Sequence, residues 1–384
     1  MEQPEGFVVP GQEKKVCRLV KSLYGLKQAP RQWHIKFDNM MMSNGFRINE
    51  CDKCVYVKGT PDSFIIVCLY VDDMLIMGST RELTMRTKNM LKDNFDMKDL
   101  GIADVILGIK IERTSEGILL SQSHYIESVL RKFNTFDDPP AKTPIDDSLR
   151  LIKNTGERVA QLEYSRIIGS LMYITNYTRT DLAYSVNKLS IFTSNPRSEH
   201  WKALTRVLRY LKYTLKFGLH YTSYPTVLEG YTDANWISDS KDSHSTSGYV
   251  FTIGGDAVSW KSTKQMFIAQ STMESEFIAL DKAVCCTQLL WMKQTLADYK
   301  CSFENVPIFC DNISAINIAQ NPVHHNRTKH IEIRHHFLRD CVSKRKIEIS
   351  FVPSQDQLAD IFTKPLSSET FSSIRARLGI MHIE

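Results

Sequence analysis

The sequence GYTDANW, residues 230–236, decides the fold of the C-terminal part of the chain. It ends the first of three short segments rich in β-branched and aromatic residues, which predict strands; the other two cover residues 246–253 and 257–261. A long segment with helical periodicity, residues 271–299, comes next. Further strands are expected at residues 306–310 and 347–352, with one helical segment between them at 313–320 and 327–344 and a last helix at 355–363. The order βββαβαβα predicts a mixed sheet covered by helices.

Four acidic residues stand at the ends of these elements. Asp233 follows the first strand, Glu276 lies in the first turns of the long helix, Asp311 ends a buried strand, and Asp360 lies in the last helix. Carboxylates that converge at one edge of a sheet repel one another unless cations lie between them. Mg²⁺, with Mn²⁺ as the alternative, prefers such hard oxygen ligands, and two such ions promote phosphodiester cleavage. Each acid alone is better explained as a solvated turn or cap residue, and only the four acids together predict a metal site.

The blocks around these acids resemble the copia-type ribonuclease H domain. They are YTDANW (231–236), SGY (247–249), SWKS (259–262), STMESEF (271–277), CDN (310–312), RTKHI (327–331) and LAD (358–360). The resemblance implies that Asp233, Glu276, Asp311 and Asp360 are the catalytic, metal-binding residues of a two-metal nuclease. Within the RTKHI block, it also implies that the nucleic-acid substrate contacts Arg327, Lys329 and His330.

Two features of this region leave alternatives open. Glu274 competes with Glu276 as the ligand on the long helix, and we prefer Glu276 because the family's ligand directly precedes an aromatic or apolar residue, here Phe277. Many relatives outside the copia group carry a mobile histidine before the last acid. The corresponding loop here, VPSQD (352–356), has none, so turnover is expected to be slower or to use another group.

Two further groups of residues suggest zinc, but neither has a complete set of ligands at the spacing of a zinc site. One is the histidine cluster His324, His325, His330, His335 and His336, for which contacts beside a nucleic-acid groove are the better interpretation, because no cysteine accompanies it at ligand spacing. The other is the pair Cys51 and Cys54, which has no second pair to complete a site.

The first half contains two apolar runs, residues 64–71 and 74–78, separated by Asp72 and Asp73. This pattern predicts a hairpin with both acids at its tip. The sequence YVDD, residues 70–73, resembles the palm motif of reverse transcriptases, which implies that Asp72 and Asp73 are catalytic metal ligands.

Other segments of the first half support the same resemblance. SLYGLKQAPRQW (22–33) is similar to the family's nucleotide-pocket segment, and LGI (107–109) to its primer-gripping hairpin, although residues 105–112 alone have the pattern of one strand. The resemblance implies substrate contacts at Gln28, Tyr70 and Gly108, with template–primer nucleic acid as the partner.

A proline-rich linker, PPAKTP (139–144), leads into a helical middle region. Helical periodicity covers residues 164–173, 181–193 and 200–215, which are similar to the family's connecting helices. The family's proline before Asp181 is Thr180 here. This region has no evident chemistry of its own.

The sequence MEQPEGF, residues 1–7, is acidic and is typical of a loop from the middle of a larger protein. In the resembled family, the polymerase's third carboxylate and its fingers lie upstream of such a loop. We therefore expect the polymerase half to be inactive by itself. A longer product that supplies the upstream segment is the alternative.

The composition is compatible with an intracellular, nucleic-acid-binding protein but does not identify its function. The 384 residues carry a net charge of +5 with both signs mixed, which allows a nucleic-acid partner. Nine scattered cysteines without a signal peptide favour an intracellular compartment, which the resemblance narrows to the cytoplasm, in a virus-like particle, or the nucleus. No apolar run is long enough to span a membrane.

The sequence thus predicts a multi-domain α+β and α/β protein, in which a truncated reverse transcriptase palm and thumb/connection helices precede the ribonuclease H-like sheet. The expected domains are the partial palm (1–120), the thumb/connection (121–225), the ribonuclease H-like domain (226–366) and a C-terminal tail (367–384). The predicted activity is hydrolysis of the RNA strand of RNA–DNA hybrids within a copia-type Pol polyprotein fragment. A non-catalytic, nucleic-acid-binding relic of a decayed transposon is the alternative.

Overall fold

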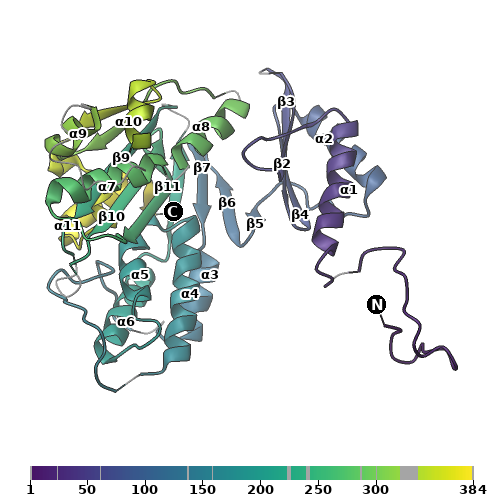
Figure 1. The fold of residues 1–384 in the computed structure, drawn as a ribbon, viewed down its shortest axis with the longest axis horizontal. Helices are drawn as coiled ribbons and strands as arrows, with labels where there is room; N and C mark the ends of the chain where they lie inside the picture. Colours follow the sequence, from purple (N-terminus) through teal and green to yellow (C-terminus); the bar gives the residue numbers. More distant parts are fainter. Residues whose placement is uncertain are drawn as a thin grey trace. The chain divides into compact units, whose positions relative to one another are not determined.

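The computed structural model describes residues 2–23, 25–60, 62–135, 138–157, 159–222, 226–238, 243–285, 288–299, 301–320 and 336–382. The chain divides into two compact units, Met1–Gly101 with Gln294–Cys301, and Ile102–Lys293 with Ser302–Glu384. Figure 1 shows the ribbon of both units. Among the described residues, no helix has the length and apolar character needed to cross a bilayer.

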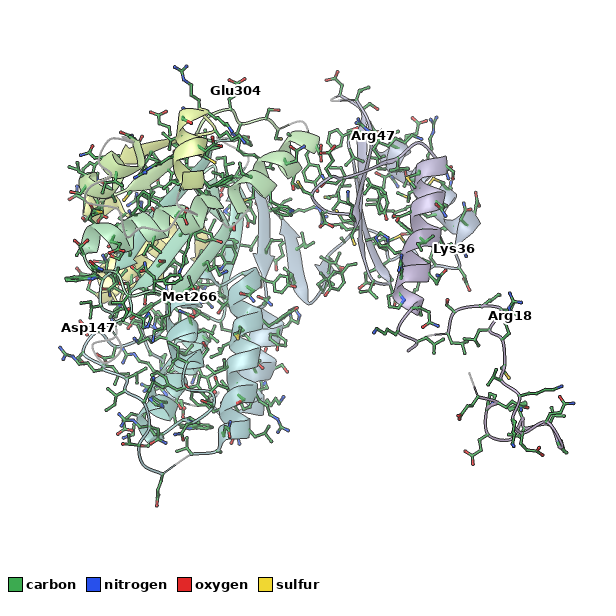
Figure 2. All side chains as sticks on the ribbon, in the orientation of Figure 1. Arg18, Lys36, Arg47, Asp147, Met266 and Glu304 are labelled. Atoms are coloured by element: carbon green, nitrogen blue, oxygen red, sulfur yellow. The ribbon has the colours of Figure 1, made fainter. Side chains whose placement is uncertain are left out.

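The first unit is a four-stranded antiparallel sheet with two helices on one face (Figure 1). Its elements are α1 Ala29–Ser43, β1 Arg47–Ile48, β2 Val55–Gly59, β3 Phe64–Tyr70, β4 Asp73–Gly78 and α2 Arg81–Asn94. Phe37 and Met41 of α1, Leu91 of α2 and Val67 of β3 are fully buried in its core. Lys36, labelled in Figure 2, lies over the Phe95 ring, 5.2 Å from its centroid.

The hairpin with two acids at its tip is confirmed. Strands β3 and β4 pair antiparallel in the order β1-β2-β3-β4, and Tyr70 lies opposite Asp73. Val71 and Asp72 therefore form a two-residue loop. Val71 has a φ of 53°, a conformation that is strained for a β-branched residue, and its carbonyl accepts a hydrogen bond from Trp33 Nε1 at 2.9 Å.

The second unit contains an antiparallel sheet of order β14-β8-β7-β6-β5. Its strands are β5 Val105–Ile106, β6 Ile109–Arg113, β7 Gly117–Ser121, β8 Phe217–Thr222 and β14 Ile380–His382. Because β7 pairs with β8, residues 102–121 belong to this compact unit rather than to the first.

One prediction for this region was wrong. Residues 105–112 are not one strand, because Leu107 and Gly108 have φ values of 50° and 70° and turn the chain between β5 and β6. The segment expected as a C-terminal tail contains helix α11, Ser368–Arg377, and strand β14. Phe371, Ile374 and Ile380 are buried in the same core as the middle helices.

The middle helices form a buried core of the second unit. They are α3 Ser123–Lys132, α4 Gln161–Tyr177, the 3-10 turn η1 Thr180–Leu182, α5 Ala183–Ser190 and α6 Ser198–Tyr213. An ion pair between Arg179 and Asp181 lies at its centre, with both side chains fully buried and 2.8 Å between Nη2 and Oδ2. The Tyr210 hydroxyl donates to Asp181 Oδ2 and accepts from Arg375 of α11, which ties α11 to this core.

The five described strands of the C-terminal sheet follow the predicted chain order, with helices after the third and the fourth strand. Its strands are β9 Leu228–Asn235, β10 Thr246–Ile253, β11 Asp256–Lys264, β12 Val306–Cys310 and β13 Ile347–Phe351. Their spatial order is β11-β10-β9-β12-β13; the first three are antiparallel, and β12 runs parallel to both β9 and β13.

The helices of this sheet differ in detail from the prediction. They are α7 Thr272–Cys285, α8 Gln288–Asp298, α9 Ile313–Gln320 and α10 His336–Ser343, followed by the 3-10 turns η4 Ser354–Asp356 and η5 Leu358–Phe362. The segment expected to be one long helix, residues 271–299, is described as α7 and α8. The helix expected at residues 355–363 is two tight 3-10 turns instead.

Candidate metal centre of the C-terminal sheet

The parallel pairing of β9 and β12 brings the first two acids together. Ile308 lies opposite Gly230 and Phe309 opposite Tyr231. Continuing this register by two residues places Asp311 level with Asp233, where both strands reach the same edge of the sheet. Asp233 is almost completely buried, and Asp311 is half-buried.

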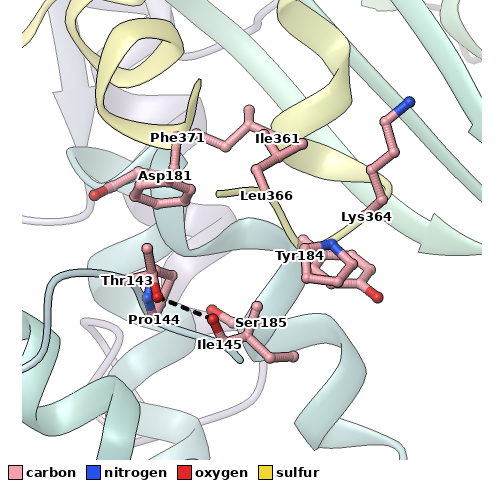
Figure 3. Close-up of a pocket in the computed structure, with 11 residues that line it drawn as sticks. Thr143, Pro144, Ile145, Asp181, Tyr184, Ser185, Ile361, Lys364, Leu366 and Phe371 are labelled. Carbon is pink, nitrogen blue, oxygen red and sulfur yellow. Dashed lines mark hydrogen bonds between the residues drawn. The ribbon is translucent and has the colours of Figure 1, made fainter. Parts of the chain in front are cut away.

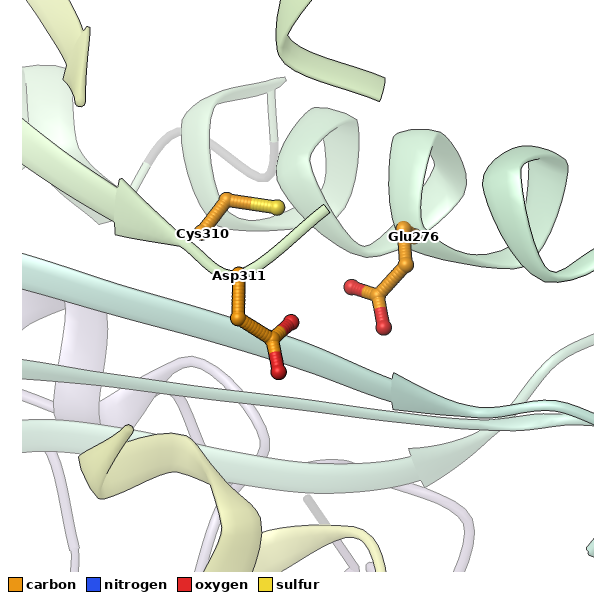
Figure 4. A group of neighbouring side chains, drawn as sticks. All are labelled: Glu276, Cys310 and Asp311. Atoms are coloured by element: carbon orange, nitrogen blue, oxygen red, sulfur yellow. The ribbon is translucent and has the colours of Figure 1, made fainter. Parts of the chain in front are cut away.

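Helix α7 adds Glu276 to this edge. Figure 4 shows its carboxylate facing Asp311, with the Cys310 thiol beside them. One ligand atom from each of these three residues lies within 4.8 Å of the other two. Phe277 is fully buried and fixes the rotation of α7, while Glu276 is only 6% exposed. Its Oε2 has no hydrogen-bond partner in the described structure.

Glu274, the alternative ligand, has a structural contact instead. Its Oε2 accepts a hydrogen bond from the backbone N–H of Gln270 at 2.7 Å, and its own N–H is capped by Ser271 Oγ at 3.2 Å. This arrangement satisfies backbone donors at the start of α7. The geometry therefore places Glu276, rather than Glu274, beside Asp311.

Asp360 reaches the cluster because η5 packs directly on the sheet. Gly248 lies opposite Asp233 in the β9–β10 ladder, and a Cβ there would lie 2.6 Å from Phe362 Cβ. Only glycine leaves room for η5 at this position. The buried Gln357 side chain adds a second connection, since its amide donates to the Thr232 carbonyl at 2.9 Å.

The four carboxylates repel one another in this buried setting. Burial and the charge of Asp233 raise the pKa of Asp360 to about 7. Burial, Asp233 and Asp311 raise the pKa of Glu276 well above its ordinary value. Burial also raises the pKa of Asp233, although Lys364 and Thr363 act in the opposite direction. The cluster is therefore costly to ionise without a bound cation.

Three neighbours interact with the cluster without being among its acids. The Thr363 hydroxyl donates to Asp233 Oδ2, and the Ser354 hydroxyl donates to Asp311 Oδ2 at 2.8 Å. The Lys364 ammonium lies 2.8 Å from Asp360 Oδ1 and 3.9 Å from Asp233 Oδ2. Burial alone would lower the pKa of Lys364, but the two carboxylates raise it above its ordinary value.

The donor set fits a hard divalent cation. Carboxylate oxygens are the ligands that Mg²⁺ takes in proteins, and the unpartnered, buried Oε2 of Glu276 is costly to leave without a donor or an ion. Cys310 is the exception, because a thiol is a softer ligand. Burial and, to a smaller extent, the charge of Glu276 raise the pKa of the Cys310 thiol, which keeps the sulfur protonated.

Lys364, Thr363 and Cys310 were not among the site residues predicted from the sequence. Lys364 had a usable signal, since it stands four residues after Asp360, a spacing that brings two side chains together on a helical turn. Cys310 immediately precedes Asp311, but alternation along a strand would place it on the opposite face. No sequence pattern indicates the contact of its sulfur with Glu276.

The acids of the first unit are placed differently. Asp72 and Asp73 are exposed at the tip of the β3–β4 hairpin, and Tyr70 is 54% exposed. Among the described residues, no third acid, histidine or cysteine joins them in a metal-sized group. Gln28 is exposed and precedes the first turn of α1, so it does not contribute a buried contact either.

Gly108 lies in the turn between β5 and β6. Its φ of +70° and the position of the Tyr173 hydroxyl, 3.0 Å from a Cβ placed there, both favour glycine. The Tyr173 hydroxyl donates to the Leu107 carbonyl and fixes this turn. Arg327, Lys329 and His330 lie outside the described residues, as does most of the predicted histidine cluster.

Comparison with known proteins supports the resemblance along the chain. The family model described as reverse transcriptase (RNA-dependent DNA polymerase) matches residues 1–147. The chain is 42% identical over 390 residues to the Pol polyprotein from transposon TNT 1-94 of Nicotiana tabacum, covering 99% of this chain and 29% of that protein. It is 36% identical to the Pol polyprotein from transposon RE2 of Arabidopsis thaliana, covering 100% of this chain and 26% of that protein. The chain thus spans less than a third of these relatives.

A shorter relative is matched over most of its length. A transposon Ty5-1 protein of Saccharomyces cerevisiae is 34% identical over 290 residues, covering 74% of this chain and 94% of that protein. Among solved structures, the N-terminal RNase H domain of a Mycobacterium tuberculosis protein matches at 10% identity and a TM-score of 0.26, covering 40% of this chain and 98% of that one. RNase H1 of Halobacterium salinarum matches at 16% identity and a TM-score of 0.25, covering 35% of this chain and 93% of that one.

Proposed function

The chain belongs to the family of Pol polyproteins of Ty1/copia-type retrotransposons, and on that premise we propose that its C-terminal sheet is a ribonuclease H. The proposed reaction is hydrolysis of the RNA strand of an RNA–DNA hybrid. The observation that carries the proposal is the group of acids at one edge of the sheet: ligand atoms of Glu276 and Asp311 lie within 4.8 Å of each other, and the charges of Asp233 and Asp311 act on both Glu276 and Asp360.

Asp233, Glu276, Asp311 and Asp360 would hold two Mg²⁺ ions, or Mn²⁺ ions in their place. When bound, such ions supply an activated water and stabilise the charge that develops on the phosphate. The chain's own contribution is to fix the ligands. The Thr363 and Ser354 hydroxyls orient the carboxylates of Asp233 and Asp311.

No side chain needs to act as the nucleophile in this proposal. The Cys310 thiol lies beside the carboxylates, but its raised pKa leaves it protonated and unreactive at neutral pH. The attacking group is therefore water. A hybrid would be recognised through its backbone shape and 2′-hydroxyl groups rather than its base sequence.

The test is cleavage of a labelled RNA–DNA hybrid by the full chain in Mg²⁺, with Asp233→Asn as the inactive variant. Asp340→Asn is the matched control, because Asp340 is an exposed acid that pairs with Lys344. We expect cleavage by the wild type and the control and none by Asp233→Asn. Binding of the hybrid without cleavage would instead favour the non-catalytic relic, and cleavage that survives Asp233→Asn would refute the assigned site.

We propose that the polymerase half, residues 1–120 with the thumb/connection at 121–225, is inactive by itself. Asp72 and Asp73 are exposed, and no third acid accompanies them within the described structure. Strand β4 is also the last strand of its sheet, and no strand of the described residues pairs with its outer edge. Primer extension on a template–primer duplex tests this, and efficient synthesis by the purified chain would contradict it.

As the product of a retrotransposon, the chain would act on nucleic acid in the cytoplasm, within a virus-like particle, or in the nucleus. Fractionation of cells that express a tagged chain tests this, and recovery with secreted proteins would exclude it.

A further inference from the structure

Lys364 is built into the carboxylate cluster. Its side chain is 35% exposed, and its ammonium lies 2.8 Å from Asp360 Oδ1 and 3.9 Å from Asp233 Oδ2. Across the described ranges, no other lysine or arginine forms an ion pair with any of the four acids. Lys364 is therefore the one cation that these carboxylates contact in the described structure.

The position of Lys364 is fixed by both its backbone and its stem. The backbone N–H of Lys364 donates to the Asp360 carbonyl at 3.2 Å, which closes a helical turn between the two residues. The stem lines a small cavity with Tyr184, Leu366 and Phe371. Figure 3 shows the ammonium at the end of this stem, pointing away from the other labelled side chains.

Thr363, the residue before Lys364, also contacts the carboxylate cluster. The Thr363 hydroxyl donates to Asp233 Oδ2, so two consecutive side chains place a hydroxyl and an ammonium on the carboxylate of Asp233. The Asn235 amide in turn contacts the Thr363 carbonyl at 3.4 Å and holds this segment against the end of β9. A salt bridge formed by a flexible surface lysine has no such support.

We propose that the Lys364 ammonium stands in for a divalent cation in the metal-free protein and competes with the metal for Asp233 and Asp360. An ammonium in contact with Asp233 and Asp360 opposes the binding of a divalent ion to the same carboxylates, because the two positive charges repel each other at short range. Metal binding therefore displaces the ammonium, whose flexible four-carbon stem can turn towards solvent. Lys364 thus keeps the empty cluster folded and lowers its affinity for metal.

This inference rests on the proposed function, because it takes the four acids to be the metal centre. Its test measures Mn²⁺ affinity directly, by the loss of the free-ion electron paramagnetic resonance signal on titration of the full chain. The variants are Lys364→Met, which keeps the stem without the charge, and Lys364→Arg, which keeps the charge. Lys344→Met is the matched control, since Lys344 forms an exposed pair with Asp340, also four residues apart and at 2.8 Å.

We expect Lys364→Met to bind Mn²⁺ at least about tenfold more tightly than the wild type, because one nearby positive charge has been removed. Lys364→Arg and Lys344→Met should bind it like the wild type. Unchanged or weaker binding by Lys364→Met would overturn the inference. Asp233→Asn shows which of the two proposals has failed. If this variant binds Mn²⁺ as tightly as the wild type, the acids are not the metal centre and the proposed function is wrong; if it binds Mn²⁺ more weakly, only the inference about Lys364 is overturned.

A second measurement uses only the wild-type protein, in case Lys364→Met does not fold. Acetylation of lysines by acetic anhydride, followed by peptide mass spectrometry, reports how accessible each ammonium is. Saturating Mg²⁺ should increase acetylation of Lys364 several-fold and leave that of Lys344 unchanged. Equal acetylation of Lys364 with and without Mg²⁺ would show that the metal does not displace it.

Discussion

The stability of the metal-free protein should fall as the pH rises from about 4 to about 7, and Asp360 should account for part of the fall. Burial and the charge of Asp233 raise the pKa of Asp360 from 3.8 to about 7 in the folded protein. A carboxyl group whose pKa is raised by folding binds its proton more tightly in the folded state. Its contribution to stability is complete below pH 4 and is lost as the pH rises through 7.

The size of the effect follows from the pKa shift. A shift of about three units corresponds to a ceiling of about 4 kcal/mol at about 1.36 kcal/mol per unit. The change observed on replacing one acid should be smaller, since Asp233 and Glu276 take part in the same repulsion and their pKa values rise as well. We therefore expect Asp360→Asn to reduce the fall in the free energy of unfolding with rising pH by at least about 1 kcal/mol, or roughly 2–4 °C in melting temperature.

The assay is thermal unfolding at pH 5 and pH 8 without metal, for the wild type, Asp360→Asn and the control Asp340→Asn. Asp360→Asn should have the smallest difference in melting temperature between the two pH values. Saturating Mg²⁺ should also reduce the difference for the wild type, because the ions replace protons as counter-charges. If the wild type and Asp360→Asn lose the same stability between pH 5 and pH 8, the inferred repulsion is absent.

Three further changes test the structure around the site. Gly248→Ala should destabilise the protein by about 1–3 kcal/mol and weaken Mn²⁺ binding, because a methyl group there collides with η5. Gly169→Ala in α4 is the control, because a Cβ there has open space. Equal losses of stability in the two variants would contradict the packing of η5 on Gly248. Arg179→Met should cost about 3–5 kcal/mol in thermal or urea unfolding, because it leaves the buried Asp181 carboxylate unpaired, and a loss below 1 kcal/mol would argue against the pair. Trp33→Phe should lower the stability of the first unit by about 1 kcal/mol, because the hydrogen bond to Val71 is lost. Hydrogen exchange of the amides in β3 and β4 measures this loss, and an unchanged exchange rate would contradict it.

The sequence predicted much of the C-terminal sheet because hydrophobic periodicity is a local property. The apolar alternation of the strands and the position of each acid at the end of an element were enough to expect the order βββαβαβα. The level position of Asp233 and Asp311 then requires only that β9 and β12 are parallel neighbours.

Other features depend on contacts that no local pattern contains. Strand β14 has three residues and forms only because it can pair with β8, so its sequence carries little periodic signal. The turn at Leu107 and Gly108 depends on positive φ values, which an apolar run conceals. The contact of Lys364 with Asp233 joins elements that are distant in sequence, and it follows from the close packing of η5 on Gly248.

The central claim is that the four carboxylates bind divalent cations at one edge of the C-terminal sheet. The most direct measurement is anomalous X-ray diffraction from crystals of the full chain soaked in Mn²⁺. We predict anomalous density between the carboxylates of Asp233, Glu276, Asp311 and Asp360, with oxygen atoms at about 2.0–2.3 Å, typical of small hard divalent ions. Manganese density confined to other sites, with these carboxylates still metal-free at saturating Mn²⁺, would contradict it.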